Sequence, residues 1–227
     1  MLPMHLAGRQ ATGLHENEPI AQFEIGSYKN FVYLILDWST RVAAIVDPQM
    51  DLTEPLRALQ AHGFQLCAVL LTHTHFDHVA GLPALLRLNP ALPVHVHSAD
   101  LHRLEPEPRQ VELIQDGSLI QIGNLSVRSI HTPGHSKGET TYLVETSPPY
   151  LLTGDTLFIR DCGRTDFEGG SNEEMFASLQ KIKALASDCI ILPGHHYAAE
   201  CASTLKQELL ASPPLQCKSV AELAALP

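Results

Sequence analysis

The stretch that says most about the fold of this chain is Cys67-Ala-Val-Leu-Leu71-Thr72-His73-Thr74-His75-Phe76-Asp77-His78. Its first five residues form an apolar run with the length of a buried strand, and this run leads directly into the histidines. His73 and His75 stand two residues apart, so in an extended segment both side chains project to the same side. Imidazoles combined with a carboxylate are ligands that suit Zn or Fe(II). The stretch therefore predicts a metal site at the end of a strand.

Three further predicted strands, the first of them alternating and half-exposed, end in the same way. Residues 125–130 lead into His131-Thr-Pro-Gly-His135, residues 150–153 into Gly154-Asp155, and residues 189–192 into Pro193-Gly-His195-His196-Tyr197. The ends of parallel or mixed strands meet at one edge of a sheet, and glycines let the backbone approach whatever is bound there. We therefore expect the four motifs to form one site. The other histidines are expected to be packed or solvated, including His131 and His196, for which a supporting role stays open.

The remaining elements alternate between strands and helices. Apolar runs predict strands at 31–36, 42–46 and 141–145, and helical spacing predicts helices at 54–61, 81–88, 172–186 and 199–210. Ser171 and Glu174 have the spacing of a capping box before the third of these helices. This order of elements indicates sheets covered by helices on the outside. We expect an N-terminal arm at residues 1–20 and one domain at residues 21–227.

Composition excludes several classes of protein. The 227 residues include 15 Lys and Arg against 25 Asp and Glu, a net charge of -10 that argues against nucleic acid as a partner. No run of apolar residues is long enough to span a membrane, and residues 1–20 lack the features of a signal peptide. The five cysteines are odd in number and form no CxxC pair. This usage is typical of free thiols in a reducing compartment, so we expect a cytoplasmic protein.

The motifs HTHFDH (73–78), PGH (133–135), GD (154–155) and PGH (193–195) together resemble those of the metallo-β-lactamase superfamily. The resemblance implies an α/β fold, the four-layer αββα sandwich, with a metal site along one sheet edge. Asp155 stands where secreted β-lactamases carry Cys, which disfavours an antibiotic hydrolase. His75 stands where flavodiiron proteins carry Glu, which disfavours that branch as well.

Within the superfamily, Ile159-Arg160 and Cys162-Gly-Arg-Thr-Asp-Phe167 are similar to the persulfide dioxygenase family. That resemblance implies an enzyme that oxidises glutathione persulfide with O2 to sulfite and glutathione. It implies one Fe(II) per chain on His73, His135 and Asp155, a set that leaves positions open for the persulfide sulfur and O2. The neighbouring His75, Asp77 and His78 would then orient ligands and bound water, with Asp77 counted among the catalytic residues.

The same region, beginning GDTLF (154–158) and continuing through Cys162-Gly163, also resembles glyoxalase II, and GRTDF (163–167) is found in small glyoxalase-like hydrolases as well. This second branch implies a different chemistry. There a dinuclear Zn or Fe centre would use His73, His75 and His135 for one metal and Asp77, His78 and His195 for the other, with Asp155 as the bridge. A bridging hydroxide would attack a hydroxyacylglutathione thioester. PGHHY favours the hydrolase, whereas the 32 residues after His195, too few for the helical domain of glyoxalase II, favour the dioxygenase. The dioxygenase is the leading expectation, and a non-catalytic metal-binding module is the third hypothesis.

Three residues beside these motifs are candidates for supporting roles. Arg164 suits a glutathione carboxylate, although a local ion pair with Asp166 is the alternative. Tyr197 is expected to contact the substrate through its hydroxyl, in a catalytic or binding role, or else to serve as packing. Cys162 is expected to be a small buried apolar residue. The family resemblance also makes a homodimer possible.

Overall fold

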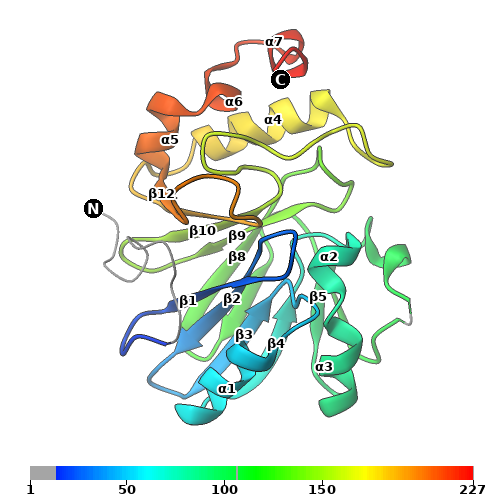
Figure 1. The fold of residues 1–227 in the computed structure, drawn as a ribbon, viewed down its shortest axis with the longest axis vertical. Coiled ribbons are helices and arrows are strands. Elements are labelled where there is room, and N and C mark those ends of the chain that lie inside the picture. The colour runs from blue at the N-terminus through cyan, green and yellow to red at the C-terminus, as the bar shows by residue number, and fades with distance from the viewer. Residues whose placement is uncertain (1–13, 106, 227) are drawn as a thin grey trace.

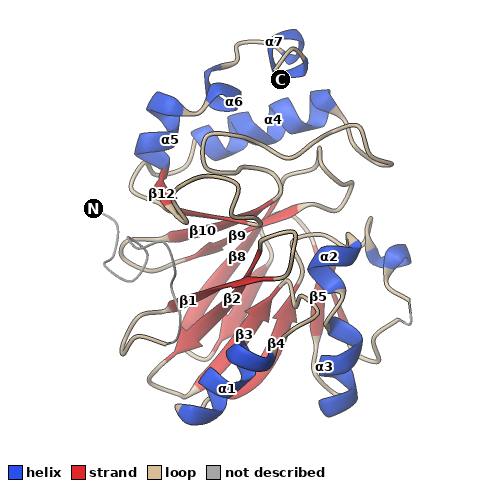
Figure 2. Ribbon diagram, viewed as in Figure 1, coloured by secondary structure: helices blue, strands red, loops and turns tan. Residues whose placement is uncertain are grey.

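The computed structural model describes residues 14–105 and 107–226. Two six-stranded mixed sheets pack face to face, and helices cover the outer face of each (Figures 1 and 2). This arrangement confirms the predicted four-layer αββα sandwich. Of the expected N-terminal arm, residues 1–13 lie outside the described residues, and the first strand begins at Ile20.

The first sheet contains the first six strands in chain order, with β1–β3 antiparallel and β3–β6 parallel. Its outer face carries helices α1–α3, in the lower half of Figure 1. The elements are β1 (Ile20–Ile25), β2 (Asn30–Asp37), β3 (Val42–Val46), α1 (Thr53–Ala61), β4 (Gln65–Leu70), α2 (Phe76–Val79), α3 (Leu82–Leu88), β5 (Val94–His97), the 3-10 helix η2 (Leu101–Arg103) and β6 (Val111–Ile114).

The second sheet has the order β12-β11-β10-β9-β8-β7, in which only β10 and β11 run parallel. Helices α4–α7 lie on its outer side, in the upper part of Figure 1. The elements are β7 (Leu119–Ile122), β8 (Leu125–His131), β9 (Thr140–Val144), β10 (Tyr150–Gly154), α4 (Asn172–Lys183), β11 (Ile190–Pro193), β12 (Ser203–Thr204), α5 (Leu205–Ala211), α6 (Pro213–Gln216) and α7 (Val220–Ala224).

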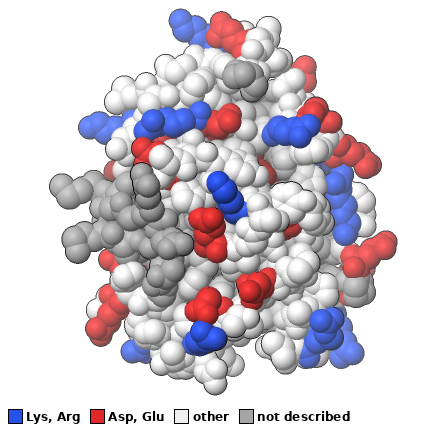
Figure 3. Space-filling view, in the orientation of Figure 1, with Lys and Arg blue, Asp and Glu red and all other residues white. Residues whose placement is uncertain are grey.

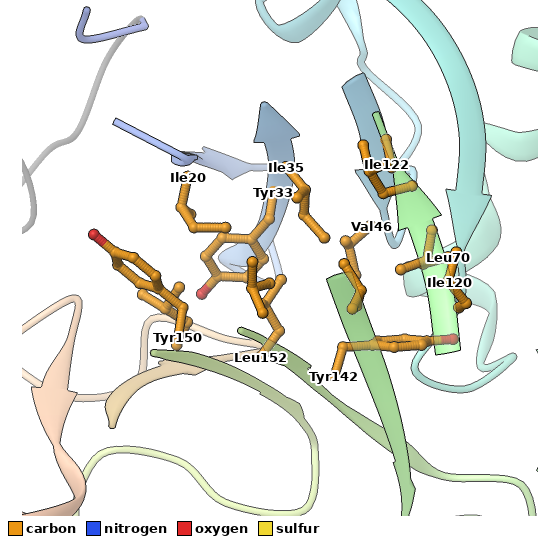
Figure 4. Close-up of a cluster of buried hydrophobic side chains, with 14 of the residues drawn as sticks. Ile20, Tyr33, Ile35, Val46, Leu70, Ile120, Ile122, Tyr142, Tyr150 and Leu152 are labelled. Atoms are coloured by element: carbon orange, nitrogen blue, oxygen red, sulfur yellow. The ribbon is translucent and has the colours of Figure 1, made fainter. Parts of the chain in front are cut away.

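The continuous apolar runs are explained by burial of both faces of the central strands. In β2, Phe31, Tyr33 and Ile35 pack between the sheets, whereas the alternating residues Val32, Leu34 and Leu36 pack under the helices. Figure 4 shows the cluster between the sheets, with Tyr33, Ile35 and Val46 facing Tyr142 and Leu152. Each such side chain stabilises the fold by about 1.5–3 kcal/mol on burial, so the strands hold their terminal loops rigidly.

The last helix that the sequence predicts begins later in the structure. The prediction of a helix at 199–210 is wrong for its first half, because residues 203–204 pair with β11 as β12 and α5 begins at Leu205. Thr204 caps α5 through a full capping box with Gln207. The helix predicted at 172–186 ends at Lys183. Ser171 caps this helix as expected, but the Glu174 carboxylate bonds Lys137 instead of closing the box.

Charged side chains of both signs are interspersed over the face shown in Figure 3. This face therefore carries no extended surface of a single sign. Among the described residues, no helix combines the length and apolarity that a membrane crossing requires.

Candidate metal centre

The four motifs meet at one edge of the sandwich, where their strands end. The loop after β4 and the start of α2 supply His73, His75, Asp77 and His78, while the loops after β8, β10 and β11 supply His135, Asp155 and His195. The ligand atoms of His73, His75 and His135 lie within 4.8 Å of one another, and so do those of Asp77, His78 and His195. The structure thus brings together every candidate ligand taken from the sequence.

Asp155 lies between the two groups. Its Oδ2 atom is 3.5 Å from Nε2 of His135 in the first group and 3.3 Å from Nε2 of His195 in the second. Its Oδ1 atom is 3.5 Å from Nε2 of His78. The carboxylate can therefore serve either as a ligand of one ion or as a bridge between two.

The cluster contains polar atoms that the protein itself does not satisfy. Nε2 of His73 and Oδ1 of Asp155 are buried without a hydrogen-bond partner. Nδ1 of His75 faces Nε2 of His135 at 2.9 Å, and Nε2 of His78 faces Nε2 of His195 at 3.1 Å. Buried polar groups are almost always paired, and facing imidazole nitrogens need a cation or proton between them. The residues therefore fit a bound metal ion.

The pKa values of the histidines are shifted in opposite directions in the two groups. Burial and the neighbouring imidazoles lower the pKa of His73, and the same causes lower the pKa of His75 to about 4. Both rings are therefore neutral and offer lone pairs. Burial also acts to lower the pKa of His78, but Asp155 and Asp47 outweigh it and raise that pKa to about 9. A metal in the second group must displace this proton, so its affinity falls as the pH falls.

Hydrogen bonds on the outer side of the rings fix which nitrogen points inward. Nδ1 of His135 donates to the carbonyl of Arg164 at 2.7 Å, and Nδ1 of His195 donates to that of Tyr28 at 2.9 Å. Nδ1 of His78 donates to Asp47 at 3.0 Å. In each case Nε2 is left as the inward atom, which is how supporting groups orient metal-binding imidazoles.

Two buried carboxylates behind the centre were not singled out from the sequence. Asp47 also accepts from the backbone N–H and the hydroxyl of Thr72, at 2.8 and 2.6 Å. Glu139 accepts from the backbone N–H of Asp155 at 3.0 Å, and its other oxygen lies 3.4 Å from Nδ1 of His73. Asp47 closes a buried strand, the same signal that marked the other motifs. Glu139 has no comparable local signal.

Gly194, in the last of the four motifs, and Gly163 both lie close against Asp155. A Cβ at Gly194 would lie 2.3 Å from Oδ1 of Asp155, and one at Gly163 would lie 2.0 Å from the Asp155 carbonyl oxygen. Any side chain at Gly194 would therefore displace the carboxylate that joins the two groups, and any side chain at Gly163 would displace the backbone of Asp155.

A cavity of about 520 Å³ opens over the centre. Outside the metal cluster its lining is largely aromatic, with two arginines and one acid, and is formed by Tyr28, Phe76, Phe158, Phe167, Arg103, Arg164 and Glu168. Tyr197 lines the same cavity, and its ring stacks on His195 with centroids 4.7 Å apart. The ring therefore packs against His195, a candidate metal ligand, and Tyr197 also lines the cavity. The packing role that the sequence offered for Tyr197 is therefore present, and its contact with a substrate stays a prediction.

The Arg164 side chain forms the local pair with Asp166 that the sequence offered as the alternative. Nε and Nη2 of Arg164 donate to the two carboxylate oxygens of Asp166 at 2.9 and 2.6 Å. Burial, with a smaller contribution from Asp161, raises the pKa of Cys162 to about 12, so its thiol stays protonated and packs in the core. His131 stacks on His97 and His196 pairs with Glu24, so neither ring belongs to the centre.

Comparison with known proteins identifies the family. The model of the metallo-beta-lactamase superfamily matches residues 28–195. The chain belongs to this superfamily. Curated superfamily relatives include a probable polyketide biosynthesis zinc-dependent hydrolase from Bacillus velezensis, 34% identical over 75% of this chain and 74% of the relative. A hydroxyacylglutathione hydrolase from Synechococcus is 39% identical over 74% of this chain and 65% of that enzyme.

A third superfamily relative is the human mitochondrial persulfide dioxygenase ETHE1, 33% identical over 82% of this chain and 71% of the relative. Among solved structures, ETHE1 from Myxococcus xanthus superposes with a TM-score of 0.78 at 25% identity and covers 92% of both chains. A superfamily protein in a di-iron-bound form superposes with a TM-score of 0.72 at 26% identity, covering 85% of this chain and 98% of that one. Homologues therefore include both a persulfide dioxygenase and a thioester hydrolase.

Proposed function

We propose that this superfamily member is an iron-dependent dioxygenase that oxidises glutathione persulfide with O2 to sulfite and glutathione. The observation that carries the proposal is the packing of the Cys162–Phe167 loop on the centre. The Arg164 carbonyl accepts from His135, and the Gly163 N–H donates to the Asp155 carbonyl at 2.9 Å. The loop resembling persulfide dioxygenases therefore contacts two of the proposed iron ligands. The likeness to ETHE1 over 92% of both chains is further support.

In this proposal His73, His135 and Asp155 hold one Fe(II). When bound, the iron would supply neighbouring coordination positions for O2 and the persulfide sulfur. Oδ1 of Asp155 faces His78 and Oδ2 faces His195, so each oxygen of the carboxylate lies beside an imidazole. The pKa of Asp155 lies below its usual range because His78 and His195 outweigh the effect of burial. Asp155 therefore stays ionised and ready to bind the metal.

The overall reaction consumes water and releases protons. Glutathione persulfide, O2 and water give glutathione and sulfurous acid, which ionises to sulfite. Asp77 is our candidate to receive a proton from that water, because its carboxylate lines the cavity and is fixed by Asn30, whose Nδ2 donates to it at 3.0 Å. Tyr197 and Phe158, packed edge to face at 5.3 Å, form an apolar wall beside His195.

One observation favours a second candidate, a dinuclear Zn or Fe thioester hydrolase. The group Asp77, His78 and His195 is complete, buried and close enough to hold a second ion, with Asp155 placed to bridge. Two metals would activate a hydroxide against a thioester carbonyl. The relatives named as hydrolases are in keeping with this alternative.

Metal content and two activities separate the candidates. Anaerobically purified, iron-loaded protein is expected to consume O2 with glutathione persulfide and to form sulfite in equal amounts. Asp77→Asn is expected to lower this rate but leave one iron bound, with Asp188→Asn, exposed before β11, as the control. Two metals per chain, lactoylglutathione turnover and loss of one metal in Asp77→Asn would establish the hydrolase instead. A verified iron-replete sample without O2 uptake would reject the dioxygenase.

A further inference from the structure

The cavity over the metal centre contains one arginine whose charge is not matched by a carboxylate of the described residues. Two arginines line the cavity, Arg164 and Arg103. Arg164 is already held in a bidentate pair by Asp166 and faces solvent with 68% of its side chain exposed. Arg103, at the end of the 3-10 helix η2, is half-buried and makes no carboxylate contact within 4 Å among these residues.

Arg103 is held in place by a backbone group instead. Its Nη2 atom donates to the carbonyl of Glu168 at 2.9 Å, in the segment that follows Phe167. This contact uses one of the five N–H donors of the guanidinium and fixes the orientation of the plane. Among the described residues the guanidinium makes no other hydrogen bond. Its remaining donors can therefore bind a carboxylate of a ligand in the cavity that Arg103 lines.

Arg103 lines the cavity that opens over the metal centre. His75 and Arg103 line the same cavity, while Tyr28 and Phe76 form an edge-to-face pair on its rim with centroids 5.4 Å apart. The cavity therefore offers a metal centre, a cationic group and an aromatic rim to one ligand. Its volume of about 520 Å³ lies within the range usual for small-molecule sites, about 300–1,000 Å³.

We propose that Arg103 binds a carboxylate of the thiol substrate and thereby determines specificity for an anionic thiol carrier. This inference deepens the proposed function, because glutathione carries two carboxylates besides the sulfur. Arg103, rather than Arg164, is the carboxylate-binding residue, since binding at Arg164 would first have to break the pair with Asp166. The Arg164 guanidinium also lies 4.6 Å from the ring centroid of Phe167, a second local contact that holds it.

Equilibrium binding tests this inference without any turnover. Metal-loaded protein is titrated by calorimetry with glutathione and with glutathione diethyl ester, in which both carboxylates are blocked. Arg103→Met is expected to weaken glutathione binding about tenfold, because it removes one charge-assisted contact at a half-exposed site. Binding of the ester is expected to stay unchanged. Arg103→Lys is expected to restore part of the affinity. Arg57→Met on the exposed face of α1 is the control and is expected to bind both ligands like the wild type.

Each outcome has a defined meaning. If Arg103→Met weakens the binding of glutathione and of its ester equally, Arg103 has a structural role and the proposal is overturned. Unchanged glutathione binding in that variant, or no glutathione binding by the wild type, would also overturn it. If Arg103→Met does not fold, as seen in an altered circular dichroism melt, the test uses Arg103→Lys instead. The proposal then requires that Arg103→Lys bind glutathione more tightly than the ester. If Arg103→Met weakens only glutathione binding, but the wild type shows no O2 uptake, the carboxylate site stands and only the dioxygenase activity is rejected.

Discussion

The substitution Gly194→Ala gives the sharpest test of the proposed role of Asp155. The new Cβ would lie 2.3 Å from Oδ1 of Asp155 and 3.0 Å from the backbone of Gly154. Real Cβ contacts essentially never fall under 3.0 Å, so the carboxylate must retreat by at least about 0.7 Å. Metal–ligand distances tolerate only about 0.2 Å. The substitution therefore moves Asp155 out of bonding range without removing any ligand.

The expected effect is on metal affinity and not on folding. Disturbing the supports of metal ligands weakens binding about 10–100-fold, and displacing a ligand itself lies at the upper end, about 2.7 kcal/mol for 100-fold. Affinity is measured by competition with a coloured chelator, and stability of the metal-free protein by urea unfolding. Gly63→Ala is the contrast, since its Cβ meets nothing within 4 Å but its φ is +67°. That variant is expected to lose about 1 kcal/mol of stability and to retain metal affinity. Metal binding by Gly194→Ala within threefold of the wild type would refute the assignment of Asp155 as a ligand.

Three further predictions concern groups away from the reacting atoms. Glu139→Gln is expected to weaken metal binding about tenfold or more in the same chelator assay, because Glu139 supports both Asp155 and His73; unchanged affinity would contradict this role. Tyr142→Phe removes a buried hydrogen bond to the Leu71 carbonyl, so urea unfolding should show a loss of about 1–2 kcal/mol with normal metal content. Asp37→Asn should be destabilised at pH 7, and the difference from the wild type should shrink as the pH falls below 3.8.

The sign of the Asp37 effect follows from its contacts. Burial acts to raise the pKa of Asp37, but hydrogen bonds from Ser39, Thr40 and the Asn124 backbone outweigh it and hold that pKa below its ordinary value of 3.8. The stabilisation is therefore fully present above the pKa of the unfolded state and is lost as the pH falls through the folded one. A pH-independent difference between Asp37→Asn and the wild type in urea unfolding would contradict this account.

The sequence predicted the strands that are buried on both faces and the motifs at their ends. β2, β3 and β10 read as continuous apolar runs because one alternating set of side chains meets the other sheet and the second set meets the helices. The strands β1, β5, β6 and β7 escaped prediction because their apolar residues form no such run. Gln22 and Glu24 interrupt β1, and β5, β6 and β7 are short and partly exposed. The late start of α5 escaped because residues 203–204 join a sheet edge, a contact with β11 that local spacing does not encode.

The sequence by itself determined the fold family and the identity of the candidate ligands, since both depend on short motifs that follow buried strands. The tertiary structure decided how these groups are supported and which neighbours face the cavity. The supports Asp47 and Glu139 lie far in sequence from the histidines that they contact. Arg103 lies 65 residues from Glu168, whose carbonyl orients it, whereas Arg164 pairs with Asp166, two residues away. Periodicity and motif spacing report only on local chain geometry, whereas these pairings follow from the packing of two sheets against each other.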